Sequence, residues 1–295
     1  MAGALLWFAL GFFAVMVVCR VIQFASMPMH LRWELYPMPL DPKHHYGGSY
    51  MEEVDYVRKP RQHVKLNGLR EMAAEVFLLK RVREHNRFGL WPFSMAMHWG
   101  VYLLFFWLIL LAVESLGGRN GLAAFTNAIG AASWVLGAVG TLGLMLRRAA
   151  CPELAAYTAP VDYLHLLFLF GIFATGLAGW FTGPAYFEAV RRLANGALSP
   201  GDLPVAGSAW ASAHLVLFAL FLIYMPFSRL FHYAAKYFTI DKVLWDDLLN
   251  ARGSEIERRV TSQLRYRLTW SGRHIAPGQS WAQEVTITDA REGKA

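Results

Sequence analysis

Four histidines lie within or at the ends of long apolar segments of this chain. They are His98, His165, His214 and His232. An ionisable side chain in a membrane-length apolar segment is costly, so each of the four is a candidate functional group. A single buried histidine can simply form a hydrogen bond between helices. Four of them favour a chemical role, and paired imidazoles between apolar helices are typical axial ligands of haem iron.

The spacing of His214 and His232 strengthens this interpretation. The two residues begin and end the segment HLVLFALFLIYMPFSRLFH. On a continuous helix their separation gives about five full turns and a rise of about 27 Å, so both imidazoles would point the same way near opposite faces of the hydrocarbon core. Two stacked haems require this arrangement. Arg229, one turn before His232, could pair with a haem propionate, or it could simply reach the lipid interface.

The elements that must position these histidines are membrane-spanning helices. The chain is 56% hydrophobic and 17% charged, and a span needs about 20 apolar residues. Five segments meet this requirement: 4–22, 95–116, 125–146, 161–181 and 210–231. The first has neither a basic n-region nor a small-residue cleavage site, which favours a retained helix over a signal peptide.

We therefore predict an all-α membrane protein with a bundle of five transmembrane helices. Residues 1–235 form the membrane domain, which includes a long cytoplasmic loop at 27–92, and residues 236–295 form a cytoplasmic tail. Two cysteines, Cys19 and Cys151, make neither a disulfide framework nor a zinc site.

The distribution of positive charge predicts the orientation. The segments 20–92, 147–160 and 229–295 hold 12, 2 and 11 Lys/Arg residues, which is 25 of the 28 in the chain. Positive residues stay on the cytoplasmic side, so the N-terminus lies outside and the C-terminus inside. This pattern also explains the net charge of +7 without a nucleic-acid partner.

Depth in the membrane then suggests which histidines pair. His98 begins the second span and His232 ends the fifth, so both lie toward the cytoplasm at a matching depth. His214 lies toward the outside, whereas His165, early in the fourth span, lies toward the cytoplasm. The predicted mismatch between His165 and His214 is nearly 20 Å by helical rise. The residues therefore support one bis-histidine haem well and a second one poorly.

The two cytoplasmic segments favour a docking role over a simple cap on the bundle. Residues 67–86 of the loop predict one amphipathic helix, with Met72, Val76 and Leu79 on its apolar face. In the tail, 236–260 predicts helix. The alternation and glycines of 265–289 favour a small hairpin.

These residues resemble a known family. HLVLFALFLIYMPFSRLFH is similar to the last helix of the γ subunit of respiratory nitrate reductases, and MHWGVYLLFF is similar to that family's second helix. HLRWELYP and YGGSYMEEVDY resemble relatives among the membrane cytochromes of sulfate reducers and of heterodisulfide-reductase-type complexes. The resemblance covers roughly residues 1–240.

The resemblance implies a dihaem cytochrome b of the bacterial inner membrane, with haem b as cofactor. Such a subunit exchanges electrons between quinone or quinol at the outer side and a cytoplasmic iron–sulfur subunit of the heterodisulfide-reductase or nitrate-reductase β type. By this resemblance, His98 and His232 hold the inner haem and His214 is one outer ligand. The family's other outer ligand falls here at Leu108. His165 then either replaces that ligand or lines a quinone site.

Other functions remain open at this point. No carboxylate pair, nucleophile triad or phosphate-binding loop is present, so substrate chemistry beyond quinone redox is not indicated. A transporter is disfavoured because the chain shows no internal repeat. A haemless membrane anchor and a sensor subunit with a single haem are the remaining alternatives, and the absorption spectrum distinguishes them.

Overall fold

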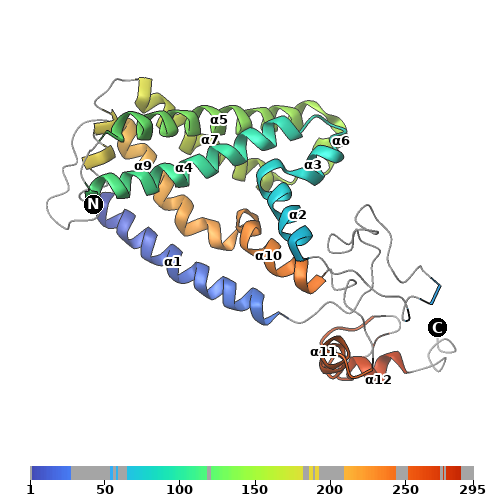
Figure 1. The fold of residues 1–295 in the computed structure, drawn as a ribbon. Helices are drawn as coiled ribbons and strands as arrows, with labels where there is room; N and C mark the ends of the chain where they lie inside the picture. Colours follow the sequence, from blue (N-terminus) through green and yellow to red (C-terminus); the bar gives the residue numbers. More distant parts are fainter. Residues whose placement is uncertain are drawn as a thin grey trace. The chain divides into compact units, whose positions relative to one another are not determined.

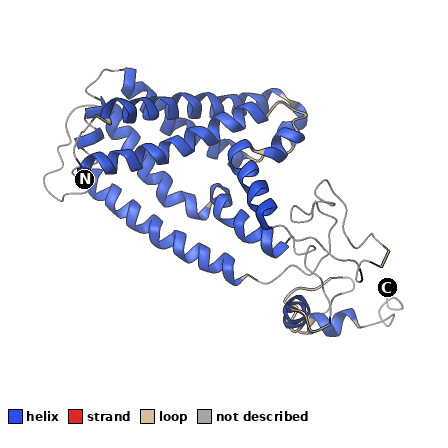
Figure 2. Ribbon diagram, in the orientation of Figure 1, coloured by secondary structure: helices blue, strands red, loops and turns tan. Residues whose placement is uncertain are grey.

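A computed structural model gives the fold of the 295-residue chain. It describes residues 2–27, 54–55, 58, 65–117, 121–181, 186–188, 190–192, 209–243, 252–272, 275 and 277–286. The chain divides into two compact units: Met1–Arg20 with Met72–Phe231, and Val21–Glu71 with His232–Ala295. Helices make up the regular structure of the described residues, which contain no strand (Figure 2).

Five helices are long and apolar enough to cross a membrane. They are α1 (Ala2–Ser26), α4 (Trp91–Gly117), α5 (Ala123–Ala150), α7 (Pro160–Phe181) and α9 (Ala209–Tyr224). All five predicted spans are confirmed as apolar helices. The ends of the first four differ from the prediction by at most four residues, whereas the fifth helix ends seven residues before its predicted end. Successive neighbours α4, α5, α7 and α9 pack side by side and alternate in direction (Figure 1).

Glycines let the backbones of α4 and α5 approach closely. A Cβ added to Gly100 would lie 2.5 Å from the Cα of Gly137, and one added to Gly140 would lie 2.2 Å from the backbone nitrogen of Met97. Ser133 donates a hydrogen bond across the same interface to the carbonyl of Gly100, at 2.8 Å. In lipid, the hydrophobic effect does not drive helices together. Small residues favour association there because they let the backbones approach closely and gain dispersion contacts.

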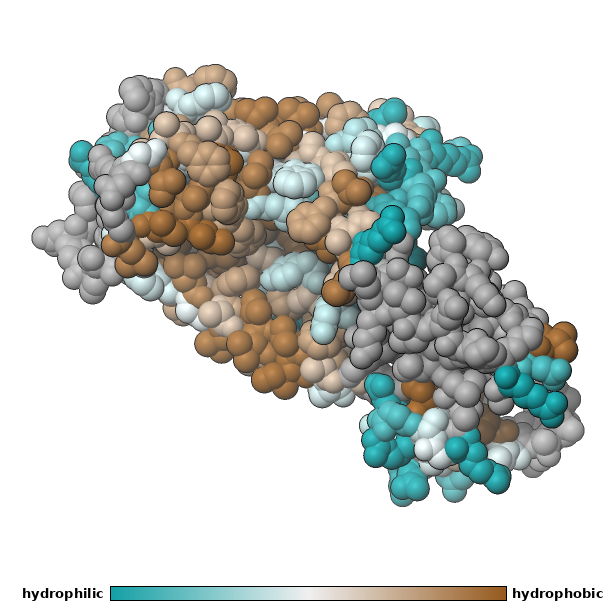
Figure 3. Space-filling model, in the orientation of Figure 1, coloured by the Kyte–Doolittle hydropathy of each residue, from teal (hydrophilic) through white to brown (hydrophobic). Residues whose placement is uncertain are grey.

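Large aromatic side chains fill the remaining core of the four-helix bundle. Trp107, Trp134 and Phe173 are almost fully buried. The Phe173 ring lies where a Cβ of Gly137 would be, and the Trp134 ring lies where a Cβ of Gly176 would be. The outward faces of the bundle are apolar, as expected for lipid contact (Figure 3).

The fifth span is not one continuous helix, and this corrects the sequence prediction. After α9, the chain forms two 3₁₀ turns, η3 (Met225–Phe227) and η4 (Arg229–Phe231), before α10 (His232–Val243) begins. Pro226 removes a backbone donor and clashes with the preceding turn, and Ser228 is extended with φ −106° and ψ 169°. His214 and His232 therefore do not share one straight helical stripe.

The single amphipathic helix predicted for 67–86 is also wrong. The segment forms α2 (Lys65–Leu78) and α3 (Lys80–Glu84), separated by Leu79 in the left-handed conformation at φ 48°. Aromatic donors on α4 satisfy the last carbonyls of α2: Trp91 Nε1 bonds Leu78 O at 2.9 Å and Tyr102 Oη bonds Val76 O at 2.9 Å. A helix end leaves such carbonyls without an intrahelical partner, so these bonds fix the end of α2 on α4.

The tail forms short helices with a minimal paired segment. α11 (Glu255–Leu264) starts at the N-cap Ser254, and α12 (Trp281–Val285) starts at the capping box of Ser280 and Gln283. Where a hairpin was predicted, the described residues form two isolated antiparallel bridges, one of which joins Arg267 to Ser280. The capping box turns the chain into α12, which prevents longer strand pairing. Predictions for loop residues 28–53 and 59–64, and for tail residues 244–251 and 287–295, lie outside the described residues.

Candidate functional site

His98 lies half-buried on α4, beside the tightest part of the α4–α5 interface. Its Nδ1 lies 2.7 Å from the carbonyl oxygen of Ser94, one turn earlier. A carbonyl can only accept, so Nδ1 is the donor in this bond, and Nε2 is the ring nitrogen through which the side chain would bind a metal. Metal-binding histidines use this arrangement, because the bond at one ring nitrogen orients the other toward the metal.

His214 has the same arrangement in a fully buried position on α9. Its Nδ1 lies 2.8 Å from the carbonyl oxygen of Ile172 and 3.4 Å from Thr175 Oγ1, both on α7. The imidazole is 7% exposed. Because the Ile172 carbonyl can only accept, Nδ1 is the donor in this bond. Nε2 is then the nitrogen through which this side chain would bind a metal.

An aromatic cluster surrounds His214. Trp134 lies edge-on to the imidazole with ring centroids 6.0 Å apart, and Phe187 stacks on Trp134 at 5.3 Å. Tyr186 contacts the same indole at 5.4 Å. Burial raises the pKa of Tyr186, so its hydroxyl stays protonated, and no described residue accepts its hydrogen bond. The cluster excludes water from His214 and leaves two buried donors beside it without a described acceptor, Tyr186 Oη and Trp134 Nε1.

His165 has a different environment from His98 and His214. It is buried near the start of α7, and its Nε2 lies 2.8 Å from the hydroxyl oxygen of Tyr224 on α9. His214 contacts α7 at Ile172 and Thr175, which is roughly 10–15 Å further along that helix by its rise per residue. The structure therefore places His165 and His214 at different levels and does not bring them together.

Arg229 forms an ion pair within the bundle unit. Its Nη1 lies 3.1 Å from Asp162 Oδ1 at the start of α7. Asp162 also accepts a hydrogen bond from the backbone N–H of Ala159, at 3.0 Å, which caps the first turn of α7. This pair gives the Arg229 guanidinium a protein partner, so a propionate is not needed to explain its position.

His232 is exposed at the start of α10 and belongs to the second compact unit, whereas His98 belongs to the first. Their pairing at an inner haem therefore stays a prediction. Of the remaining histidines, His85 is exposed on the segment after α3. The others lie outside the described residues: His30, His44, His45, His63 and His274.

A buried ion pair that the sequence analysis missed lies at the opposite end of the bundle from Arg229. Arg191 Nε lies 2.7 Å from Glu114 Oε2, and both side chains are less than a tenth exposed. Thr126 donates to the other Glu114 oxygen, and Arg191 donates to Asn127 Oδ1 at 2.6 Å. The lone carboxylate in the second apolar span was the available signal, because an unpaired charge at that depth would be costly.

The pair holds the segment that carries the aromatic cluster. Residues 186–188 and 190–192 are helical, and they contribute Tyr186, Phe187 and Arg191 to buried positions. Arg191 also donates to the carbonyl oxygen of Ala123 at 3.0 Å. These bonds fix the segment to α4 and α5, and thereby hold Tyr186 and Phe187 against Trp134 beside His214.

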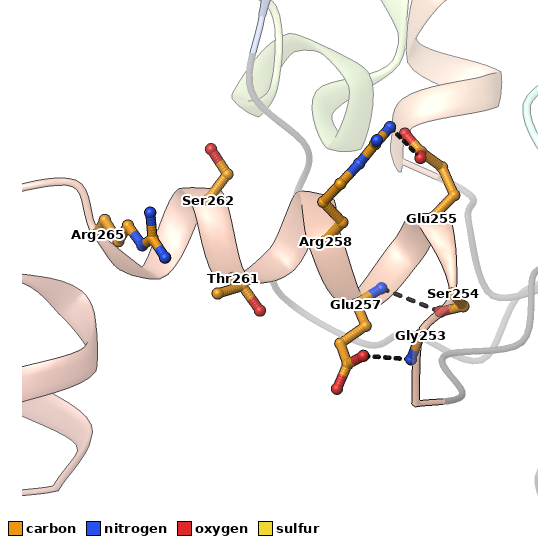
Figure 4. Close-up of a pocket in the computed structure, with 8 residues that line it drawn as sticks. All are labelled: Gly253, Ser254, Glu255, Glu257, Arg258, Thr261, Ser262 and Arg265. Carbon is orange, nitrogen blue, oxygen red and sulfur yellow. Dashed lines mark hydrogen bonds and ion pairs between the residues drawn. The ribbon is translucent and has the colours of Figure 1, made fainter.

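A surface pocket lies elsewhere, in the tail, and includes none of the candidate ligands. It has a volume of about 480 Å³ and is lined by α11 and the turn before it, from Gly253 to Arg265 (Figure 4). Ser254 and Glu257 face each other there through the helix cap, with Glu257 N–H donating to Ser254 Oγ at 3.1 Å. One helix and the residues that flank its two ends supply the lining, so this pocket is an open hollow on the side of α11.

The described residues contain no cluster of three or more His, Cys, Asp or Glu side chains that could hold a metal ion. A bis-histidine haem site needs only two such ligands. No family model, curated protein or solved structure matches this chain.

Proposed function

We propose that this chain is the haem b membrane subunit of a respiratory complex. It would pass electrons between the quinone pool and a cytoplasmic iron–sulfur partner subunit in the bacterial inner membrane. It would thus act as the quinone-oxidoreductase membrane subunit of a multi-subunit enzyme, similar to the γ subunit of nitrate reductases and to the cytochromes of heterodisulfide-reductase-type complexes. Its N-terminus would lie outside and its C-terminus in the cytoplasm.

One observation supports this proposal most strongly. His98 and His214, on two different membrane-length helices, each hold Nδ1 on a backbone carbonyl, at 2.7 and 2.8 Å. Both imidazoles therefore present Nε2 as the ligand nitrogen. His85 has a similar bond to Arg81 O at 3.1 Å, but it is exposed and lies outside the spans. The two candidate ligands differ from His85 because they combine this bond with a position in a membrane-length apolar helix.

Different side chains would hold the haem groups and exclude water from them. His98 and His214 would each hold one haem, with His232 as the second ligand for the haem at His98. A bound haem supplies reversible one-electron chemistry, and burial and axial ligands set its potential. Trp134, Phe187 and the ion-paired segment would keep water from His214.

The contact between His165 and Tyr224 favours a protein in which only one haem has two histidine ligands. The bond from His165 Nε2 to Tyr224 occupies the nitrogen that would bind iron. Breaking it would leave a partly buried hydroxyl without its partner, at a cost of about 1–3 kcal/mol. On this account His214 takes the second ligand of its haem from a residue other than His165. A haemless anchor would need neither histidine.

The reduced absorption spectrum of the purified protein tests the proposal. We expect a b-type α-band, and a pyridine haemochrome assay gives the number of haems per chain. His98→Ala and His214→Ala should each lower that number. His85→Ala is the matched control, because it removes an imidazole with the same Nδ1 contact outside the spans, and it should leave the haem content unchanged. Colourless protein from a haem-sufficient host, intact in its complex, would contradict the proposal.

A further inference from the structure

Four arginines gather where α4 begins and α5 ends. Arg83 lies over the ring of Trp91, the first residue of α4, with 5.7 Å from Cζ to the ring centroid. Arg147 lies in the last turn of α5 against Gly89, where an added Cβ would lie 2.5 Å from Nη2. Arg87 and Arg148 complete the group, which we call the four-arginine cluster.

Little negative charge balances this cluster. Among the described residues, the one carboxylate within ion-pair distance is Glu153, 3.8 Å from Arg87. Arg148 Nη1 donates to the neutral hydroxyl of Thr158 at 3.2 Å. Arg83 and Arg147 are exposed and have no ion pair to a described residue. An excess of positive charge therefore remains accessible on this surface, where Figure 3 shows hydrophilic side chains near α3 and α6.

The position of the cluster indicates what would meet this charge. It lies at the common end of two membrane-length helices, α4 and α5. Trp91 and the largely exposed Tyr157 lie at the same end, and such aromatic residues are enriched at the depth of lipid headgroups. Basic residues just beyond a span are attracted to anionic lipid headgroups at this level.

We propose that the four-arginine cluster binds the phosphate of an anionic phospholipid. A guanidinium group matches a phosphate with two parallel hydrogen bonds, which lysine cannot provide. Arg83 and Arg147 come from separate helices and both contact the segment 89–91, so one phosphate can lie between them. The lipid would thereby join the start of α4, next to His98, to the end of α5. This inference does not depend on haem.

Native mass spectrometry of the detergent-purified chain tests the proposal. Dioleoyl phosphatidylglycerol and dioleoyl phosphatidylcholine are titrated separately, and the dissociation constant of the first bound lipid is measured. We expect the wild-type protein to prefer phosphatidylglycerol. Arg83→Gln and Arg147→Gln should each weaken that binding by about fivefold, the contribution of one arginine near an anionic surface. Binding of phosphatidylcholine should not change.

Arg192→Gln is the matched control. It also removes one exposed arginine, from the opposite end of the bundle, and should leave phosphatidylglycerol binding unchanged. Equal affinity for the two lipids in the wild-type protein would overturn the proposal, as would an equal loss in the control. If the cluster variants keep phosphatidylglycerol but lose a co-purifying acidic protein, the surface docks that protein and the lipid assignment is wrong. Far-UV circular dichroism checks that all variants are folded.

Discussion

The ion pair of Glu114 and Arg191 is the most consequential single interaction of the bundle at the scale of residues. Each partner satisfies the other at 2.7 Å in a site closed to water. Removing one partner leaves an uncompensated buried charge, which costs far more than the pair gains over apolar substitutes. Replacing one of the two residues should therefore lower the stability of the fold much more than replacing both with apolar residues.

We predict that Glu114→Ala lowers the free energy of unfolding by about 3–5 kcal/mol. The measurement is reversible unfolding in mixed micelles of mild detergent and SDS, followed by circular dichroism. Glu188→Ala is the control, because its pair with Arg192 spans 3.8 Å with the arginine largely exposed, and exposed pairs contribute about 0–1 kcal/mol. A double variant Glu114→Met/Arg191→Met should recover much of the loss. If Glu114→Ala and the control Glu188→Ala lowered the free energy of unfolding equally, a buried charge at Arg191 would be contradicted.

The contact of His165 with Tyr224 leads to a second prediction at this scale. We expect His165→Phe to keep the haem content of the wild-type protein and to reduce stability by about 1–3 kcal/mol, because the Tyr224 hydroxyl loses its partner. Adding Tyr224→Phe should remove most of that cost. A loss of haem in His165→Phe, with normal stability, would instead make His165 an iron ligand.

The sequence alone identified the histidines but not their partners. Apolar surroundings mark His98, His165 and His214 as unusual, and the bond of His98 to Ser94 follows from helical geometry. The bonds of His214 to Ile172 and of His165 to Tyr224 depend on the register between α7 and α9. That register is set by packing of many side chains across the interface, which no local pattern contains.

At the scale of elements, glycines decide how closely α4 and α5 pack. We predict that Gly140→Ala destabilises the protein by about 1–3 kcal/mol, because its new Cβ would overlap the backbone nitrogen of Met97. It should also lower the haem content, since Met97 adjoins His98. Thermal unfolding in micelles and the haemochrome assay measure both effects.

Gly171→Ala is the control for that experiment. Its Cβ would meet only Leu217 Cδ1, at 3.6 Å, which is ordinary contact. Alanine gains about 0.5–1 kcal/mol over glycine within a helix, so this variant should be as stable as the wild-type protein or more so. If both alanine variants behaved alike, close packing at Gly140 would not be the cause.

The sequence predicts the helices well where a single requirement, the length of the apolar run, determines them. A membrane span needs an unbroken apolar run, and the five runs match α1, α4, α5, α7 and α9. The break after Tyr224 was missed because apolar residues continue through Pro226, and hydropathy does not register a missing backbone donor. The break at Leu79 was missed because a left-handed leucine has no sequence signature.

At the scale of the whole molecule, the remaining question is which end of the bundle faces the cytoplasm. The four-arginine cluster and Arg229 lie at one end, at the junctions of α4, α5 and α7, while the Glu114–Arg191 pair lies at the other. The first set is largely exposed and the second is buried and neutralised. Lys and Arg residues near the ends of spans are retained on the cytoplasmic side, and more of them lie at the end with the four-arginine cluster. That end should therefore be cytoplasmic.

Reporter fusions test this orientation directly. We predict that green fluorescent protein is fluorescent, and alkaline phosphatase inactive, when fused after Val243 or within 151–159, between α5 and α7. The same reporters should give the reverse result within 118–122, between α4 and α5. Neutralising Arg147 and Arg148 together should weaken the bias without reversing it, because the long loop and the tail keep most of the positive charge. Phosphatase activity after Val243 would show that the bundle has the opposite orientation. His214 and its aromatic cluster would then face the cytoplasm, and the assignment of that end to quinone would fail with it.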